Sequence, residues 1–206
     1  MSTVNEGVCV WLTGRSGSGK STIARELVGR LEQRGRVVTV LDVVPLLAKR
    51  PFERTSEGKL LRKGYVASEI VRHGGAVVCV AVSARRATRE RVRAMVGADR
   101  FIEVFVDVPS GVAKTRKVAR GRRPRLSKRL RRAARRMVGF FRPGGTRSYE
   151  QPEAPDLRVD ATRVSPEAGA RMILDLLEEH GTLRRRVREV SPGRVADRVH
   201  ASRGRR

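Results

Sequence analysis

The sequence predicts an α/β fold in which a five-stranded parallel sheet is flanked by helices. Apolar, β-branched runs alternate with helical patterns along the chain, which is typical of a parallel sheet covered on both faces. A glycine-rich string follows the first apolar run and precedes a helical stretch. The length of 206 residues suits one domain with an appended tail.

The elements follow one another in strand–helix order. The apolar runs predict strands at Val8–Thr13, Val37–Leu41, Ala76–Val82, Phe101–Val106 and, more weakly, Leu157–Val159. Helical patterns between and after them predict helices at Gly19–Arg34, Glu57–His73, Ala87–Val96, Ser110–Val118, Leu126–Val138 and Pro166–Glu179. The last helix has the clearest limits, because Ser165 is a good N-cap, Pro166 suits the first helical position and Gly181 stops it.

The string GRSGSGKS at residues 14–21 is a complete phosphate-binding P-loop between a strand and a helix. Its glycines allow backbone N–H groups to turn toward phosphates, while Lys20 reaches the β- and γ-oxygens and Ser21 coordinates Mg²⁺. We therefore expect a P-loop nucleoside-triphosphate hydrolase fold of the nucleotide-kinase-like kind that binds ATP and Mg²⁺. The expected nucleotide-binding residues are Gly14, Arg15, Ser16, Gly17, Ser18, Gly19, Lys20, Ser21 and Thr22.

The positive charge is concentrated in two stretches. Residues 114–142 carry fourteen Lys or Arg and no acid, and residues 184–206 carry a net +7, out of +25 for the whole chain. We assign residues 1–181 to a kinase domain with a lid at about 114–148, and residues 182–206 to a mostly disordered basic tail. Either stretch could bind nucleic acid or another polyanion, or form an arginine-rich solvated surface. The lid stretch could also clamp a multiply charged acceptor.

The remaining composition points to a cytoplasmic protein. Cys9 and Cys79 each lie in an apolar strand-like run, which favours buried thiols over a disulfide or a metal pair. No apolar run approaches the ~20 residues of a membrane span. A homodimer is compatible with the sequence, which does not decide the oligomeric state.

A P-loop occurs in several enzyme classes, so other positions must separate them. The chain has no Asn/Thr-Lys-x-Asp guanine-reading string, and the Ala76–Val82 strand ends in Ser83 without the acid of a typical Walker B strand. Small-molecule kinases fit better, since they carry an arginine-bearing lid that can hold transferring phosphoryl oxygens.

Three strings resemble the adenylylsulfate (APS) kinase family. Residues 11–22 (WLTGRSGSGKST) are similar to its W-x-T-G-L-S-G-x-G-K-S-T opening, with Arg15 for leucine; residues 101–109 (FIEVFVDVP) and 149–155 (YEQPEAP) resemble two later segments. The resemblance implies an ATP-dependent kinase that transfers the γ-phosphoryl group to the ribose 3′-hydroxyl of adenylylsulfate, giving 3′-phosphoadenylylsulfate. It also implies catalytic roles for Lys20, Asp42 and Arg116.

The acceptor motifs depart from the family pattern. In the family's D-G-D-N-x-R stretch only Asp42 is kept, since Val44 and Leu47 replace the second acid and the arginine. Lys117 replaces the usual aspartate of the lid. The resemblance implies substrate-binding roles for the residues that match it or lie near its positions, namely Arg62, Ser83, Arg86 and Phe141.

Four functions therefore remain open from the sequence. The chain could phosphorylate adenylylsulfate, or a hydroxyl of a related nucleotide or small molecule, because the acceptor motif is altered. It could instead be an ATP-binding pseudoenzyme, or a regulatory protein that binds nucleic acid or another polyanion. Asp42, as the only acid left in its turn, is the expected catalytic carboxylate, whereas Asp107 is expected to be structural.

Overall fold

Five parallel strands form a single sheet in the order β2-β3-β1-β4-β5 in the computed structural model, which describes residues 6–42, 56–121 and 149–182. The strands are β1 (Val8–Thr13), β2 (Val38–Leu41), β3 (Ala76–Val80), β4 (Phe101–Asp107) and β5 (Leu157–Asp160). The predicted parallel sheet is therefore confirmed, and each strand lies within two residues of its predicted limits.

The helices also lie close to their predicted positions. They are α1 (Lys20–Gln33), α3 (Ser56–Arg72), α4 (Arg86–Val96), α5 (Ser110–Gly121) and α7 (Pro166–Glu179). Helix α5 is three residues longer than its pattern predicts. The Ser165 side chain accepts a hydrogen bond from the Ala168 N–H, which confirms the predicted N-cap of α7. The predicted helix Leu126–Val138 and all of the predicted tail 182–206 except Thr182 lie outside the described residues; Thr182 is buried, and its hydroxyl donates to the Leu177 carbonyl oxygen.

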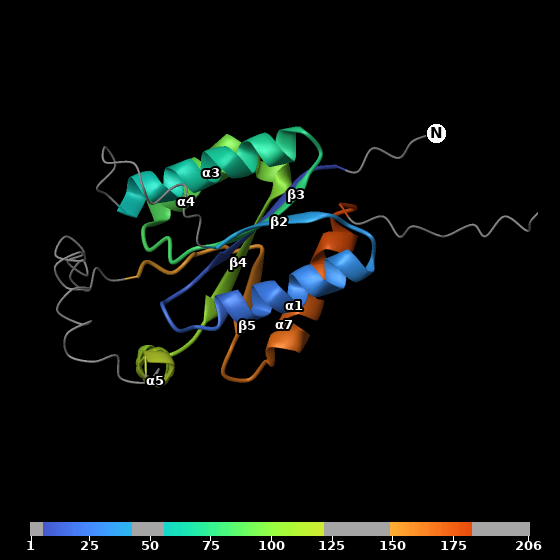
Figure 1. Cartoon of the computed structure of the whole chain (residues 1–206). Helices are drawn as coiled ribbons and strands as arrows, with labels where there is room; N and C mark the ends of the chain where they lie inside the picture. Colours follow the sequence, from blue (N-terminus) through green and yellow to red (C-terminus); the bar gives the residue numbers. More distant parts are fainter. Residues whose placement is uncertain (1–5, 43–55, 122–148, 183–206) are drawn as a thin grey trace, which may run out of the picture.

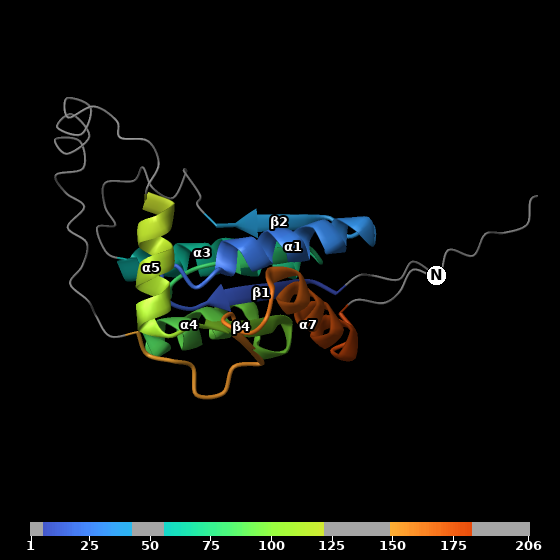
Figure 2. The ribbon, with the colours of Figure 1, turned by 90° about the horizontal axis from the view of Figure 1, so that it is seen from below.

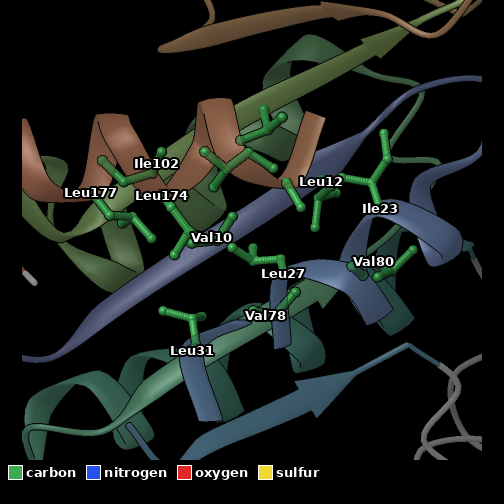
Figure 3. Close-up of a cluster of buried hydrophobic side chains, with 14 of the residues drawn as sticks. Val10, Leu12, Ile23, Leu27, Leu31, Val78, Val80, Ile102, Leu174 and Leu177 are labelled. Carbon is green, nitrogen blue, oxygen red and sulfur yellow. The ribbon is translucent and has the colours of Figure 1, made fainter. Parts of the chain in front are cut away.

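Two helical layers cover the sheet (Figure 1). Helices α1 and α7 pack on one face, where Val10 and Leu12 of β1 contact buried leucines of both helices (Figure 3). Helices α3 and α4 cover the other face, where Cys9 and Trp11 point. Successive β1 residues thus point to opposite hydrophobic clusters, which explains why this central strand is apolar throughout.

The arrangement fixes where a ligand can bind. In the order β2-β3-β1-β4-β5, strands β2 and β3 lie on one side of β1, and strands β4 and β5 lie on the other. The direction in which strands are added therefore reverses at β1. In open α/β sheets, ligands bind at the carboxyl ends of the strands next to such a reversal. Figure 2 shows α5 at the end of the sheet toward which the β1 and β2 arrows point. None of the helices within the three described ranges is long and apolar enough to cross a membrane.

The two cysteines are buried thiols on neighbouring strands, as predicted. The Sγ atoms of Cys9 and Cys79 lie 4.0 Å apart, and burial raises the pKa of the Cys9 thiol well above its usual value. Because the unfolded thiol ionises at a lower pH than the folded one, this group destabilises the fold as pH rises above about 8.5.

We therefore expect both thiols to resist a disulfide exchange reagent such as DTNB in the folded protein at pH 8. Modification requires opening of the sheet, so it should be slower than in guanidinium by roughly 10³-fold or more, given typical domain stabilities. Rapid reaction of either thiol in the native protein, followed by absorbance at 412 nm, would contradict their burial.

Candidate active site

The P-loop connects β1 to α1 and has the backbone conformation that its glycines predict. Gly17 and Gly19 have φ angles of 92° and 102°, in the left-handed region that favours glycine. Gly14 passes so close to β4 that a Cβ there would lie 2.4 Å from the Val106 carbonyl oxygen. Behind the loop, the first N–H groups of α1 point along the helix axis toward the space that phosphates would occupy.

Lys20 begins α1 and its ammonium lies inside the loop. Its Nζ donates hydrogen bonds to the Gly14 and Arg15 carbonyl oxygens at 2.9 and 2.8 Å and to Ser18 Oγ at 3.3 Å. The side chain is only 6% exposed, so the charge is held within the loop. A phosphate bound to the loop would therefore lie close to the Lys20 ammonium.

One cavity of about 390 Å³ lies beside the P-loop and holds the predicted lid arginine. It is lined by residues 17–19 and the start of α1 on one side, and by residues 161–166, between β5 and α7, on the other. Arg116 of α5 also lines it, and its Nη2 donates a hydrogen bond to the Ala161 carbonyl oxygen at 3.0 Å. Arg116 is thus placed next to the P-loop, as a lid arginine requires.

A second cavity, of about 370 Å³, lies between α1 and the strands β2 and β3, and its polar and charged lining residues are Ser21, Arg25, Glu32 and Asp42. Ser21 is the second residue of α1, and Asp42 directly follows β2. The fold therefore places the predicted metal ligand and the predicted catalytic residue on one cavity, although they are far apart in the sequence. Val44 and Leu47, the two altered acceptor positions, lie outside the described residues.

The ends of β2 and β3 are joined by a buried lysine that the sequence interpretation did not identify. Lys63 of α3 donates from Nζ to the main-chain oxygens of Asp42 and Val80, at 2.8 and 2.7 Å. Burial lowers the pKa of Lys63, and the neighbouring Cys79 and Asp42 side chains oppose that shift in part. Lys63 lies three residues after Leu60 and four before Ala67, on the buried stripe of α3. This spacing was the signal in the sequence that Lys63 is buried.

Ser83 lies at the centre of a buried hydrogen-bond network beyond the end of β3. It is 1% exposed and has a φ of 28°, which is strained for a residue other than glycine. Its Oγ accepts a hydrogen bond from Trp11 Nε1 at 3.2 Å and lies 2.7 Å from Thr13 Oγ1. Arg89 donates to its carbonyl oxygen at 2.8 Å. Ser83, for which substrate binding is predicted, is therefore held rigidly by its hydrogen bonds.

Tyr149 extends this network to the segment that follows the lid. Its hydroxyl lies 2.8 Å from Thr13 Oγ1, and its ring stacks on Phe105. Burial raises the pKa of Tyr149 to about 12, so the hydroxyl stays protonated at neutral pH. The guanidinium carbon of Arg15 lies 5.7 Å from the ring centroid, which links the P-loop to this segment at the position where the family has leucine.

The other predicted acceptor residues differ in how they are held. Arg86 begins α4, where its side chain pairs with Glu90 and Glu153 and its N–H donates to a Glu150 carboxylate oxygen. Arg62 lies in α3, next to Lys63. Phe141 lies outside the described residues. Substrate contacts by these residues, and by Ser83, stay predictions.

Asp107 forms an ion pair between strands, which is compatible with the structural role predicted for it. It ends β4, and its carboxylate accepts a hydrogen bond from Arg158 of β5 at 2.6 Å. This ion pair joins β4 to β5 through the Asp107 carboxylate. Asp42, by contrast, lines the cavity that Ser21 also lines.

Comparisons with known proteins agree with this geometry. The family model for adenylylsulphate kinase matches residues 6–160. An adenylyl-sulfate kinase of Synechococcus sp. (strain JA-3-3Ab) is 37% identical over 184 residues, covering 86% of this chain and 97% of the relative. Another, of Enterobacter sp. (strain 638), is 36% identical over 185 residues, covering 87% of each.

A solved structure shows the same fold at a similar level of identity. The Mycobacterium tuberculosis APS kinase CysC, in complex with AMPPNP and APS, superimposes with a TM-score of 0.65 at 31% identity. The match covers 84% of this chain and 98% of that one.

Proposed function

Because this chain belongs to the adenylylsulfate kinase family, whose members are ATP-dependent kinases, we propose that it transfers the γ-phosphoryl group of ATP to the ribose 3′-hydroxyl of adenylylsulfate. One observation carries the proposal. Ser21, the second residue of α1, and Asp42, which directly follows β2, line the same cavity of about 370 Å³, which supports a joint role in phosphoryl transfer.

ATP fits the site on the P-loop side. Its phosphates would lie along residues 14–22, where N–H groups of the loop and of the first turn of α1 are available. Its base and ribose would enter the 390 Å³ cavity between the P-loop and residues 161–166. The relative that was solved with AMPPNP and APS supports this assignment of nucleotide substrates.

Two residues that line the second cavity have side chains that suit Mg²⁺. The Ser21 hydroxyl and the Asp42 carboxylate are both oxygen donors, which this hard cation prefers, and Mg²⁺ commonly completes its shell with water and substrate phosphates. We propose that Ser21 would hold the cation and that Asp42 would hold the acceptor hydroxyl or a water beside the cation. When bound, the cation neutralises charge on the β- and γ-phosphates.

The transfer then depends on positioning and electrostatics. The acceptor 3′-oxygen forms a bond to the γ-phosphorus as the bond from that phosphorus to the β–γ bridging oxygen breaks, and ADP leaves with the electron pair. Asp42 orients the hydroxyl and receives its proton, which then passes to solvent. Lys20 and Arg116 stabilise the charge on the migrating group, as cations do in other phosphoryl transfers.

A panel of acceptors tests the proposal. We expect adenylylsulfate to give the highest kcat/KM, measured by ADP release, among adenosine nucleotides and small hydroxylated metabolites. We expect a value below about 10⁴ M⁻¹s⁻¹, the lower end of the common enzymatic range, because Val44 and Leu47 replace polar groups of the acceptor motif.

The same altered motif favours a second candidate, in which the acceptor is a hydroxyl of a related nucleotide or small molecule. A higher kcat/KM for such a compound than for adenylylsulfate would establish it. If no acceptor in the panel released ADP from a folded, ATP-binding protein, the pseudoenzyme alternative would replace both. Binding of nucleic acid or another polyanion by the basic stretches stays a separate prediction, since most of these residues lie outside the described ranges.

A further inference from the structure

Lys63 occupies an unusual place for a lysine. It is 8% exposed, and it lies on the face of α3 that packs on the sheet, between Leu60 and Ala67. Lysine is rarely buried unless its ammonium has partners, because removing the charge from water is costly. Here the partners are two main-chain carbonyl oxygens, those of Asp42 and Val80.

These two carbonyls belong to neighbouring strands at one level of the sheet. The last paired residues of β2 and β3 are Leu41 and Cys79, so Asp42 and Val80 lie one position beyond. At this position the Lys63 ammonium donates hydrogen bonds to the main chains of both strands. Lys63 therefore holds the carboxyl ends of β2 and β3 at a fixed separation.

The fixed position matters because Asp42 and Ser21 line the same cavity. The Asp42 carboxylate is attached to the residue whose main chain Lys63 holds, and the preceding strand β2 has only four residues. Displacement of a reacting group by about 1 Å can cost on the order of 10² in rate. A bond to the Asp42 main chain can therefore control the geometry of phosphoryl transfer without touching substrate.

We propose that Lys63 is a positioning residue that acts on phosphoryl transfer through Asp42. The proposal rests on the catalytic assignment of Asp42 made above. It differs from a purely structural role in one respect: loss of Lys63 should affect the rate only while the Asp42 carboxylate is present.

A double-mutant cycle measures this dependence. We expect Lys63→Met, which keeps the side-chain length but removes the N–H donors, to lower kcat by roughly tenfold or more while the KM for ATP changes by less than about twofold. In the Asp42→Asn background, where the Asp42 carbonyl is retained, Lys63→Met should lower kcat by less than about twofold. Equal losses in both backgrounds, or a wild-type rate in Lys63→Met, would overturn the proposal.

Arg36 supplies a matched control. It is also 8% exposed, burial also lowers its pKa, and its Nη2 donates to a main-chain oxygen, that of Glu6, at 2.6 Å. It precedes β2, at the opposite end of that strand from Asp42. The Arg36→Met protein should have a kcat within about twofold of wild type. This should hold even if the melting temperature of Arg36→Met falls as far as that of Lys63→Met.

Amide hydrogen exchange separates failure of this proposal from failure of the proposed function. Lys63→Met should increase exchange at Leu41 and Asp42 by roughly tenfold or more relative to Arg36→Met, whatever the acceptor is. Unchanged exchange there would overturn the proposal even in an active enzyme, whereas absence of adenylylsulfate turnover by the wild type would count against the function alone. If Lys63→Met does not fold, Lys63→Gln takes its place in both measurements.

Discussion

Replacing Lys20 with alanine is expected to lower turnover by roughly 10³-fold or more, the scale on which a cation at a transferring phosphoryl group contributes to rate. The ammonium lies within the P-loop, against the Gly14 and Arg15 carbonyls, where it can move onto the β- and γ-oxygens of ATP. Alanine leaves the loop glycines in place but provides no charge for the migrating group. Steady-state ADP release at saturating ATP and acceptor measures the effect.

Arg34→Ala is the matched control, at the C-terminal cap of the same helix. Arg34 directly follows α1 at the end remote from the P-loop and forms an exposed ion pair with Glu178. Exposed pairs contribute only about 0–1 kcal/mol to stability, so this variant should keep wild-type turnover. Turnover by a folded Lys20→Ala protein within tenfold of wild type would contradict the role assigned to the P-loop.

Asp42→Asn is expected to lower kcat by at least ~10²-fold, the usual cost of losing a positioned acid or base. Asparagine keeps the shape of the side chain and the main-chain oxygen that Lys63 binds, but it cannot accept the proton of the acceptor hydroxyl. The melting temperature should therefore change little while the rate falls.

Asp107→Asn is the comparison that tests this assignment. Asp107 also lies at the carboxyl end of a strand, but its carboxylate pairs with Arg158. We expect a kcat close to wild type for Asp107→Asn and a small loss of stability from the broken ion pair. A larger rate loss in Asp107→Asn than in Asp42→Asn would reverse the two assignments.

Much of the fold could be predicted from the sequence because its local signals agree with the final packing. Strand β1 is apolar throughout since both of its faces are covered, and α7 has a capping serine and a proline at its start. The end of α5 was less clear, because its last residues have no apolar periodicity that marks where a helix stops. The positive φ of Ser83 could not be predicted, since nothing local distinguishes that serine from one in an ordinary turn.

The site was predictable where a motif fixes it and not where tertiary contacts do. The P-loop glycines favour the positive φ angles that the loop adopts, so its conformation could be predicted, whereas nucleotide binding by residues 14–22 stays a prediction. The bond between Arg116 and the Ala161 carbonyl, and those of Lys63 to two strand ends, join segments far apart in the chain. Every residue has a main-chain carbonyl oxygen, so the sequence does not show which of them accept these hydrogen bonds. A lysine within an apolar stripe was the single visible sign of the second contact.

The most direct test of the proposed kinase activity is product analysis by mass spectrometry after incubation with ATP, Mg²⁺ and adenylylsulfate. The proposed mechanism predicts one molecule of 3′-phosphoadenylylsulfate for each ADP formed, because the γ-phosphoryl group passes directly to the ribose hydroxyl. Formation of ADP and inorganic phosphate with adenylylsulfate unchanged, or no ADP at all from a folded protein that binds ATP, would contradict it.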